Sequence, residues 1–184
     1  MKKNRKLSTI TMVQVSLFAA ITAVLSQISI PLPSGVPITL QTLAIALCGY
    51  VLGWKLGLLS TGVYILLGAV GLPVFASLRG GPGVLFGVTG GFIWGFLALA
   101  GLCGMGMQFK KKLLSIMLGI AGLCVCHLLG ALQFSLTSKT TFVGSLMFVS
   151  VPYFVKDVIC VAVSYLIAVT VRTALNKTHF SENG

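Results

Sequence analysis

Acidic residues are scarce in this sequence, and the position of one of them suggests chemistry. The 184 residues include only two acids, and because Glu182 lies in the polar tail, Asp157 is the only carboxylate in the apolar body of the chain. An ionised carboxylate among apolar helices is costly unless it is paired, hydrogen-bonded or in a water-filled cavity. Asp157 is therefore our first candidate for ligand binding. The alternative is an exposed acid at a helix start, favoured by the helix dipole.

Two cations could complete a site around this acid. Arg79 lies in a predicted loop on the same side of the membrane, and Lys156 directly precedes Asp157. Adjacent helical residues point about 100° apart, so Asp157 need not be spent on Lys156. One pocket could then bind a small solute that has N–H donors at one end and an acid at the other. The alternative for each cation is a headgroup contact at the membrane surface.

Neutral polar groups and glycines are predicted near the same membrane face. Gln41 follows a proline-rich stretch, and Thr89, Gly90 and Gly91 fall inside a predicted helix that opens with GGPG at 80–83. Glycines allow close backbone approach, and free N–H groups at a helix start can bind an oxygen ligand. His127 lies in an apolar segment without a second ligand, which favours a hydrogen bond between helices over a metal site.

Several classes of function lack their motifs. The sequence contains no Walker motif, no HExxH, no GxSxG and no cluster of carboxylates, so we expect neither an enzyme, nor a metal site, nor a bound cofactor. The five cysteines show no metal-ligand spacing, and packing is their simplest role. Because the chain has no ATP-binding motif and only one carboxylate in its apolar body, uptake against a gradient would need energy from another subunit.

The elements that must position these residues are membrane helices. Apolar types make up 57% of the chain and charged types only 8%, which is too few for a soluble surface. A span needs about 20 apolar residues. The predicted all-α bundle has six spans, at 8–30, 40–53, 56–74, 84–107, 113–136 and 152–174. The second is short, so we expect it to bend or lean on its neighbours. Residues 31–37 should form an ordered turn or cap because prolines break helices.

The positive charges predict the orientation of the bundle. The net charge is +11, but the basic residues punctuate apolar runs instead of forming one basic face, so nucleic acid is not an expected partner. With the N-terminus inside, the outer side keeps only Arg79, Lys139 and Lys156, and the other basic residues face the cytoplasm. The inner set is Lys2, Lys3, Arg5, Lys6, Lys55, Lys110, Lys111, Lys112, Arg172 and Lys177. We thus expect one membrane domain, 1–184, with a basic cytoplasmic N-terminus (1–7), a bundle (8–174) and a cytoplasmic tail (175–184).

Small residues mark faces where helices can approach closely. Ala19 and Ala23 share one stripe of the first span, and glycines repeat every four residues at 49, 53 and 57 and at 91 and 95. Packing within the chain is the usual explanation. For Ala19 and Ala23, docking to an external partner is the alternative.

Three sequence blocks carry a family resemblance. LPSGVPITLQT at 32–42, YILLGAVGLPVFA at 64–76 and GGPGVLFGVTGG at 80–91 resemble the biotin-binding subunit family (BioY) of energy-coupling factor vitamin transporters, over nearly the whole chain. The resemblance implies a six-helix subunit of the cell membrane that binds biotin with high affinity near the outer face. It also implies a complex with a membrane coupling protein and two cytoplasmic ATPases. The Ala19 and Ala23 stripe resembles the motif with which such subunits dock on the coupling protein.

The site residues implied by the resemblance include two departures. The family commonly shows GPTGG where this chain has GVTGG at 87–91, and GDxxK where it has KDVIC at 156–160, so that Cys160 replaces a lysine. Asp157 would accept hydrogen bonds from the ureido group of biotin, and Arg79 or Lys156 would meet the valerate carboxylate. Gly90 and Gly91 would enclose the ring. Alternatives are another small vitamin or acid in the same fold, a stand-alone facilitator, or a membrane assembly protein without a ligand.

Overall fold

The computed structural model describes residues 8–109 and 111–181, with side chains described through Ala174. The basic residues 2, 3, 5, 6 and 110 and the end of the predicted tail, 182–184, lie outside the described residues. The elements are α1 (Thr9–Gln27), β1 (Ser29–Ile30), β2 (Ile38–Thr39), α2 (Gln41–Leu52), α3 (Trp54–Ala69), a 3-10 turn η1 (Ala76–Leu78), α4 (Pro82–Leu85), α5 (Gly90–Gly106), α6 (Lys112–Ser138), α7 (Phe142–Val149) and α8 (Val151–Ser181).

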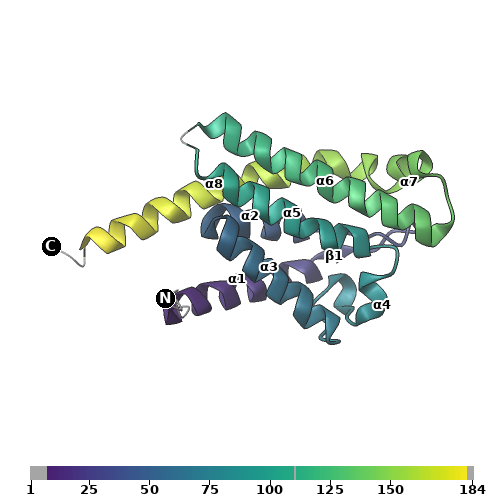
Figure 1. Ribbon diagram of the computed structural model, residues 1–184, viewed down its shortest axis with the longest axis horizontal. Coiled ribbons are helices and arrows are strands. Elements are labelled where there is room, and N and C mark those ends of the chain that lie inside the picture. Colours follow the sequence, from purple (N-terminus) through teal and green to yellow (C-terminus); the bar gives the residue numbers. More distant parts are fainter. Residues whose placement is uncertain (1–7, 110, 182–184) are drawn as a thin grey trace, which may run out of the picture.

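The helices form one bundle with two distinct ends. α1 begins and α8 ends at one end, and α4, α7 and the β1–β2 pair lie at the other (Figure 1). By length and composition, α1, α6 and residues 151–174 of α8 can each cross a membrane, and α2, α3 and α5 are shorter apolar helices. α2 is largely buried among its neighbours, as its short length predicted.

The segment between α1 and α2 is an ordered hairpin loop. Ser29 pairs with Thr39 and Ile30 with Ile38 in an antiparallel arrangement. The predicted first span therefore ends too late, because the helix stops at Gln27 and Ser29 and Ile30 pair with β2. The expectation of an ordered turn at residues 31–37 is confirmed, although the short strands that close it were not predicted from the all-α pattern.

The predicted fourth span, 84–107, is wrong as a single helix. The chain forms the short α4, leaves helical geometry after Phe86, and starts again as α5 at Gly90. Gln133 of α6 donates to the carbonyls of Leu85 and Gly87, both at 2.8 Å. The amide side chain thus supplies donors for backbone carbonyls that a helix break leaves unpaired. The break was not visible in hydropathy because every residue around it is apolar or small.

The start of the last predicted span agrees with the structure, but its end does not. Pro152 is the second residue of α8, close to its predicted role as a first-turn residue. The helix runs on to Ser181, so the predicted polar tail continues the helix in its first part. The core between the helices is aromatic and aliphatic, and its largest fully buried side chains include Tyr50, Tyr64, Phe75 and Leu99.

Candidate functional site

A cavity lies at the end of the bundle that carries the hairpin loop. Its empty volume, mouth included, is about 700 Å³. Its walls come from the hairpin loop, the loop after α3, and helices α2, α4, α5, α6, α7 and α8. Phe92, Ile93, Phe96 and Leu123 make an apolar wall, and the polar lining residues are Thr39, Gln41, Thr42, Arg79, Thr89, His127, Tyr153, Lys156 and Asp157.

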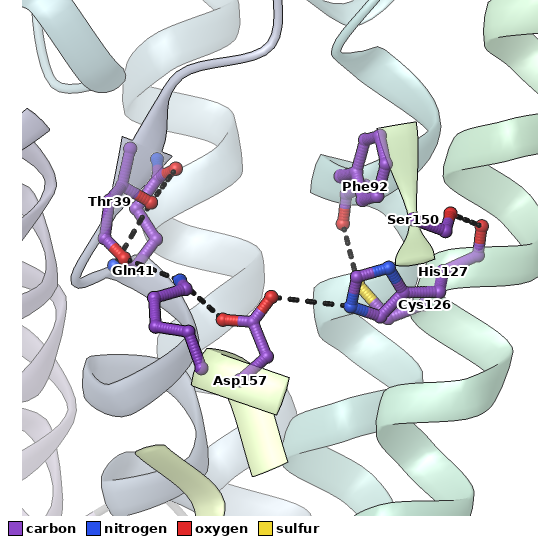
Figure 2. Close-up of polar contacts among 8 residues, drawn as sticks. Thr39, Gln41, Phe92, Cys126, His127, Ser150 and Asp157 are labelled. Carbon is purple, nitrogen blue, oxygen red and sulfur yellow. Dashed lines mark hydrogen bonds and ion pairs between the residues drawn. The ribbon is translucent and has the colours of Figure 1, made fainter. Parts of the chain in front are cut away.

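Asp157 is buried in this cavity wall, with 5% of its surface exposed. Its Oδ2 lies 3.2 Å from His127 Nε2, and its Oδ1 lies 2.5 Å from Lys156 Nζ (Figure 2). The alternative of an exposed acid at a helix start is therefore wrong. No donor among the described residues makes an aligned hydrogen bond to Oδ1, in spite of the close ammonium. The carboxylate is held in place but keeps acceptor capacity.

Lys156 reaches Asp157 although the two residues are neighbours on α8. The angle between adjacent residues does not keep the two apart, because the long lysine stem bends its ammonium back to the carboxylate. The same ammonium donates to the Thr39 carbonyl at 2.9 Å. Lys156 thereby joins α8 to the hairpin loop over the cavity. Cys160, the position where the family commonly has a lysine, is buried and is not among the cavity-lining residues.

Gln41 forms a second polar part of the wall. It accepts a hydrogen bond from Thr39 Oγ1 at 3.1 Å and donates to Tyr64 Oη at 2.7 Å. Both ends of its amide are therefore used, which fixes the orientation of the side chain. Its prediction as a residue of the site agrees with its position in the lining.

Arg79 and Thr89 also line the cavity, but the two glycines after Thr89 do not. Arg79 is exposed at the mouth, whereas Asp157, the only acid in the described part of the chain, pairs with Lys156 and His127 instead. A side chain at Gly90 would overlap the Leu85 carbonyl, and one at Gly91 the Leu129 carbonyl of α6. The Cβ positions of Gly90 and Gly91 are thus taken up by helix packing, and their contact with a ligand stays a prediction.

The predicted docking stripe on α1 faces inward. Ala19 is 2% exposed and belongs to the core, and Ala23 is half-buried against it. The exposed face of α1 instead carries Val13, Leu17 and Ala20. In this conformation the Ala19 side chain is covered by the chain itself, and docking of a partner on this stripe stays a prediction. Gly49 and Gly57 also serve internal packing, since a side chain at Gly57 would meet Gly49 Cα.

His127 is the site residue that sequence reasoning did not assign to the ligand. Its hydrogen bond to Asp157 joins α6 to α8. This confirms the prediction that His127 makes a hydrogen bond between helices. Since an ionised carboxylate only accepts, His127 Nε2 carries the proton. The ring packs edge-on against Phe92 and Phe154, with centroid distances of 5.6 and 5.5 Å. A lone histidine in an apolar helix was the available signal, and its partner, Asp157, is the only acid in the described part of the chain.

Three comparisons with known proteins bear on this geometry. The model of the BioY family matches residues 1–177. The chain belongs to the BioY family. A biotin transporter BioY from Thermotoga maritima is 38% identical over 88% of this chain and 95% of its own length. Biotin transporter BioY2 from Lactococcus lactis is 33% identical over 96% of this chain and 97% of its own length.

A solved structure matches the fold of this chain. The S-component for biotin from an ECF-type ABC transporter superposes with a TM-score of 0.80, at 26% identity, over 94% of this chain and 95% of that one. BioY membership and the apolar helices make this chain a membrane protein. The described residues hold no group of three or more His, Cys, Asp or Glu side chains that could bind a metal ion.

Proposed function

We propose that this chain captures biotin with high affinity, as the substrate-specific subunit of an energy-coupling factor transporter. The observation that carries the proposal is Asp157, a buried carboxylate in a cavity wall that is held between His127 and Lys156. The relatives at 38% and 33% identity are named biotin transporters, and the matching solved chain is a biotin S-component.

In the proposed complex, Asp157 Oδ1 accepts the ureido N–H groups of biotin. The ligand displaces the Lys156 ammonium from that oxygen, and Lys156 stays bonded to the Thr39 carbonyl. Arg79, the exposed cation at the cavity mouth, then meets the valerate carboxylate. The apolar wall on α5 supplies the surface for the ring system. The two charged ends of the cavity thus match the two polar ends of the ligand.

The proposed topology has six membrane spans, α1, α2, α3, α5, α6 and α8, with both termini in the cytoplasm. In support, α1 begins and α8 ends at the same end of the bundle (Figure 1). The elements carrying Lys55, Lys111, Lys112 and Arg172 start or end there, and Arg79, Lys139 and Lys156 belong to the opposite end. Short loops rich in lysine and arginine face the cytoplasm, so the cavity opens to the outside.

The proposed partners are a membrane coupling protein and two ATPase subunits. The sequence contains no nucleotide-binding motif that could supply ATP hydrolysis within this chain. The matching solved chain is described as part of an ECF-type ABC transporter, which supports energy input from separate subunits.

Equilibrium binding by the chain purified alone tests the proposal. Native mass spectrometry should find co-purified biotin, and titration of the ligand-free protein with biotin should give a one-to-one complex. Other small vitamins and carboxylic acids should compete only weakly. Preferential binding of a different vitamin would keep the capture role and replace the substrate. Absence of any ligand under conditions where the protein is folded would contradict the proposed function.

A further inference from the structure

Three side chains at or just after the end of α1 bond to the loop that bears Arg79. Ser26 donates to the Val74 carbonyl, Ser29 Oγ lies 3.3 Å from Ser77 Oγ, and the Gln27 amide bonds the loop backbone at several points. Gln27, the last residue of α1, accepts a hydrogen bond from Leu78 N at 2.9 Å and donates to the carbonyl of Phe75 at 3.2 Å. Its Nε2 also contacts the carbonyls of Ala23 and Pro73 at 3.1 and 3.4 Å. Because a backbone N–H only donates, the bond from Leu78 fixes which end of the amide faces the loop.

The backbone of this loop has a conformation that needs such support. Ser77 and Leu78 have φ values of +60° and +55°, in the left-handed region that residues with side chains rarely adopt. Phe75 N donates to the Arg79 carbonyl at 2.9 Å, which closes residues 75–79 into a small ring. Ser77, Leu78 and Arg79 are all exposed, so little packing holds this side of the ring. Persistent strained torsions require surrounding contacts that determine them.

The inner side of the same loop is anchored in the cavity wall. The Phe75 ring is 1% exposed and meets Tyr64 edge-on, at a centroid distance of 5.5 Å. It fills the space above Gly68, where any side chain would overlap it. Tyr64 in turn accepts the hydrogen bond from Gln41. Phe75 therefore fixes where the loop enters the cavity wall, and Gln27 fixes the turn that follows it and leads to Arg79.

We infer that Gln27 is a positioning residue that holds Arg79 at the cavity mouth and so sets the preference for a ligand with a negatively charged end. The inference rests on the proposed function, in which Arg79 meets that charge. Without Gln27, Leu78 N and the Phe75 carbonyl turn to solvent, the left-handed turn relaxes, and Arg79 samples positions away from the cavity. The ring-binding part of the site, around Asp157, keeps its geometry because none of its contacts involves Gln27.

The test compares two ligands that differ only in charge. Biotin and its neutral carboxamide are titrated into the purified full chain carrying Gln27→Ala, Gln27→Asn or Arg79→Ala. A charge-assisted hydrogen bond corresponds to roughly a tenfold to hundredfold change in affinity, so Arg79→Ala should weaken biotin by about that factor and leave the carboxamide almost unchanged. Gln27→Ala should weaken biotin by about tenfold, again with the carboxamide unchanged, and the double variant should be no weaker than Arg79→Ala alone.

Carboxamide binding also reports whether each variant is folded, and Gln27→Asn keeps the polar groups but shortens their reach. Gln14→Ala, more than three turns earlier on α1, is the matched control and should bind both ligands as the unmodified protein does. Equal weakening of both ligands by the Gln27 variants, or no weakening, would overturn the inference while Arg79→Ala still discriminates. If Arg79→Ala does not discriminate between the ligands, the proposed role of Arg79 fails and the inference fails with it.

Discussion

Two regions of the bundle pack in opposite ways. Between α5 and α6, glycines bring the backbones together so closely that side chains at Gly91, Gly95 or Gly122 would meet the partner helix. Around Asp157, by contrast, α6, α8 and the hairpin loop stand apart, and polar side chains fill the gap. In lipid, small residues favour close helix contact, and buried polar groups mark function.

The two regions meet at Phe92. Its ring occupies the space above Gly130 of α6, and the same residue lines the cavity and packs against His127. The close-packed interface therefore sets the position of one cavity wall. We therefore expect substitutions in the α5–α6 interface to prevent folding, and substitutions in the cavity to leave the protein folded but alter ligand binding.

The largest expected effect is from Gly95→Val. A side chain there would meet the backbone of Cys126, which cannot move without separating α5 from α6. Overpacking of this kind costs at least about 1–3 kcal/mol, so we expect loss of monodisperse protein on size-exclusion chromatography. The control is Gly62→Ala in α3, which has open space around it and should be neutral or slightly stabilising. A well-behaved Gly95→Val protein would show that the interface is not tightly packed.

The next largest effect is from Asp157→Asn. The substitution keeps the shape of the side chain but removes the charge that its N–H partners need. Charge-assisted hydrogen bonds contribute about 1.5–3 kcal/mol, so biotin affinity should fall by roughly one to two decades while thermal stability changes little. Calorimetric titration with biotin measures the first and a melting curve the second. Unchanged affinity would remove Asp157 from the binding site.

The sequence predicted these two regions to different degrees. Hydropathy and charge predicted the apolar segments and the importance of Asp157, because a lone carboxylate among apolar residues stands out in composition alone. The same reasoning did not predict that Gly90, Gly91 and Ala19 pack inside the chain, since a small residue that contacts a ligand or partner looks the same in sequence as one that packs against a neighbouring helix. The packing role of the two glycines becomes visible only from the positions of the Leu85 and Leu129 carbonyls in the structure.

Interactions that depend on side-chain reach were also beyond the sequence. The rule that adjacent helical residues diverge holds for Cβ directions, but the flexible lysine stem lets Lys156 return to Asp157. The break between α4 and α5 depends on Gln133, which is distant in sequence from the carbonyls that it caps. The Lys156 and Gln133 contacts both require the tertiary structure.

A smaller effect is expected from His127→Leu. Leucine removes the donor that holds Asp157 Oδ2, and the carboxylate then loses its fixed orientation toward the ligand. We expect about a tenfold loss of biotin affinity, equivalent to about 1.4 kcal/mol. His127→Gln restores an N–H donor of similar reach and should recover most of that loss. Equal affinities for the leucine and glutamine variants would mean that His127 serves packing against Phe92 and Phe154 alone.

The smallest effect is expected from Lys156→Met, because two consequences oppose each other. The variant removes the ammonium that competes with the ligand for Asp157, which favours binding, but it also unties the hairpin loop from α8. The lysine side chain is 31% exposed, so its ion pair is partly screened and is worth at most about 1 kcal/mol. Equilibrium affinity should stay within about threefold of the unmodified protein, while biotin dissociates faster in a chase experiment because the loop opens more readily.

The control is Lys139→Met, which changes an exposed lysine at the same end of the bundle and should leave the dissociation rate unchanged. If biotin dissociates from Lys156→Met and from Lys139→Met at the same rate, the contact with the Thr39 carbonyl does not hold the ligand in the cavity.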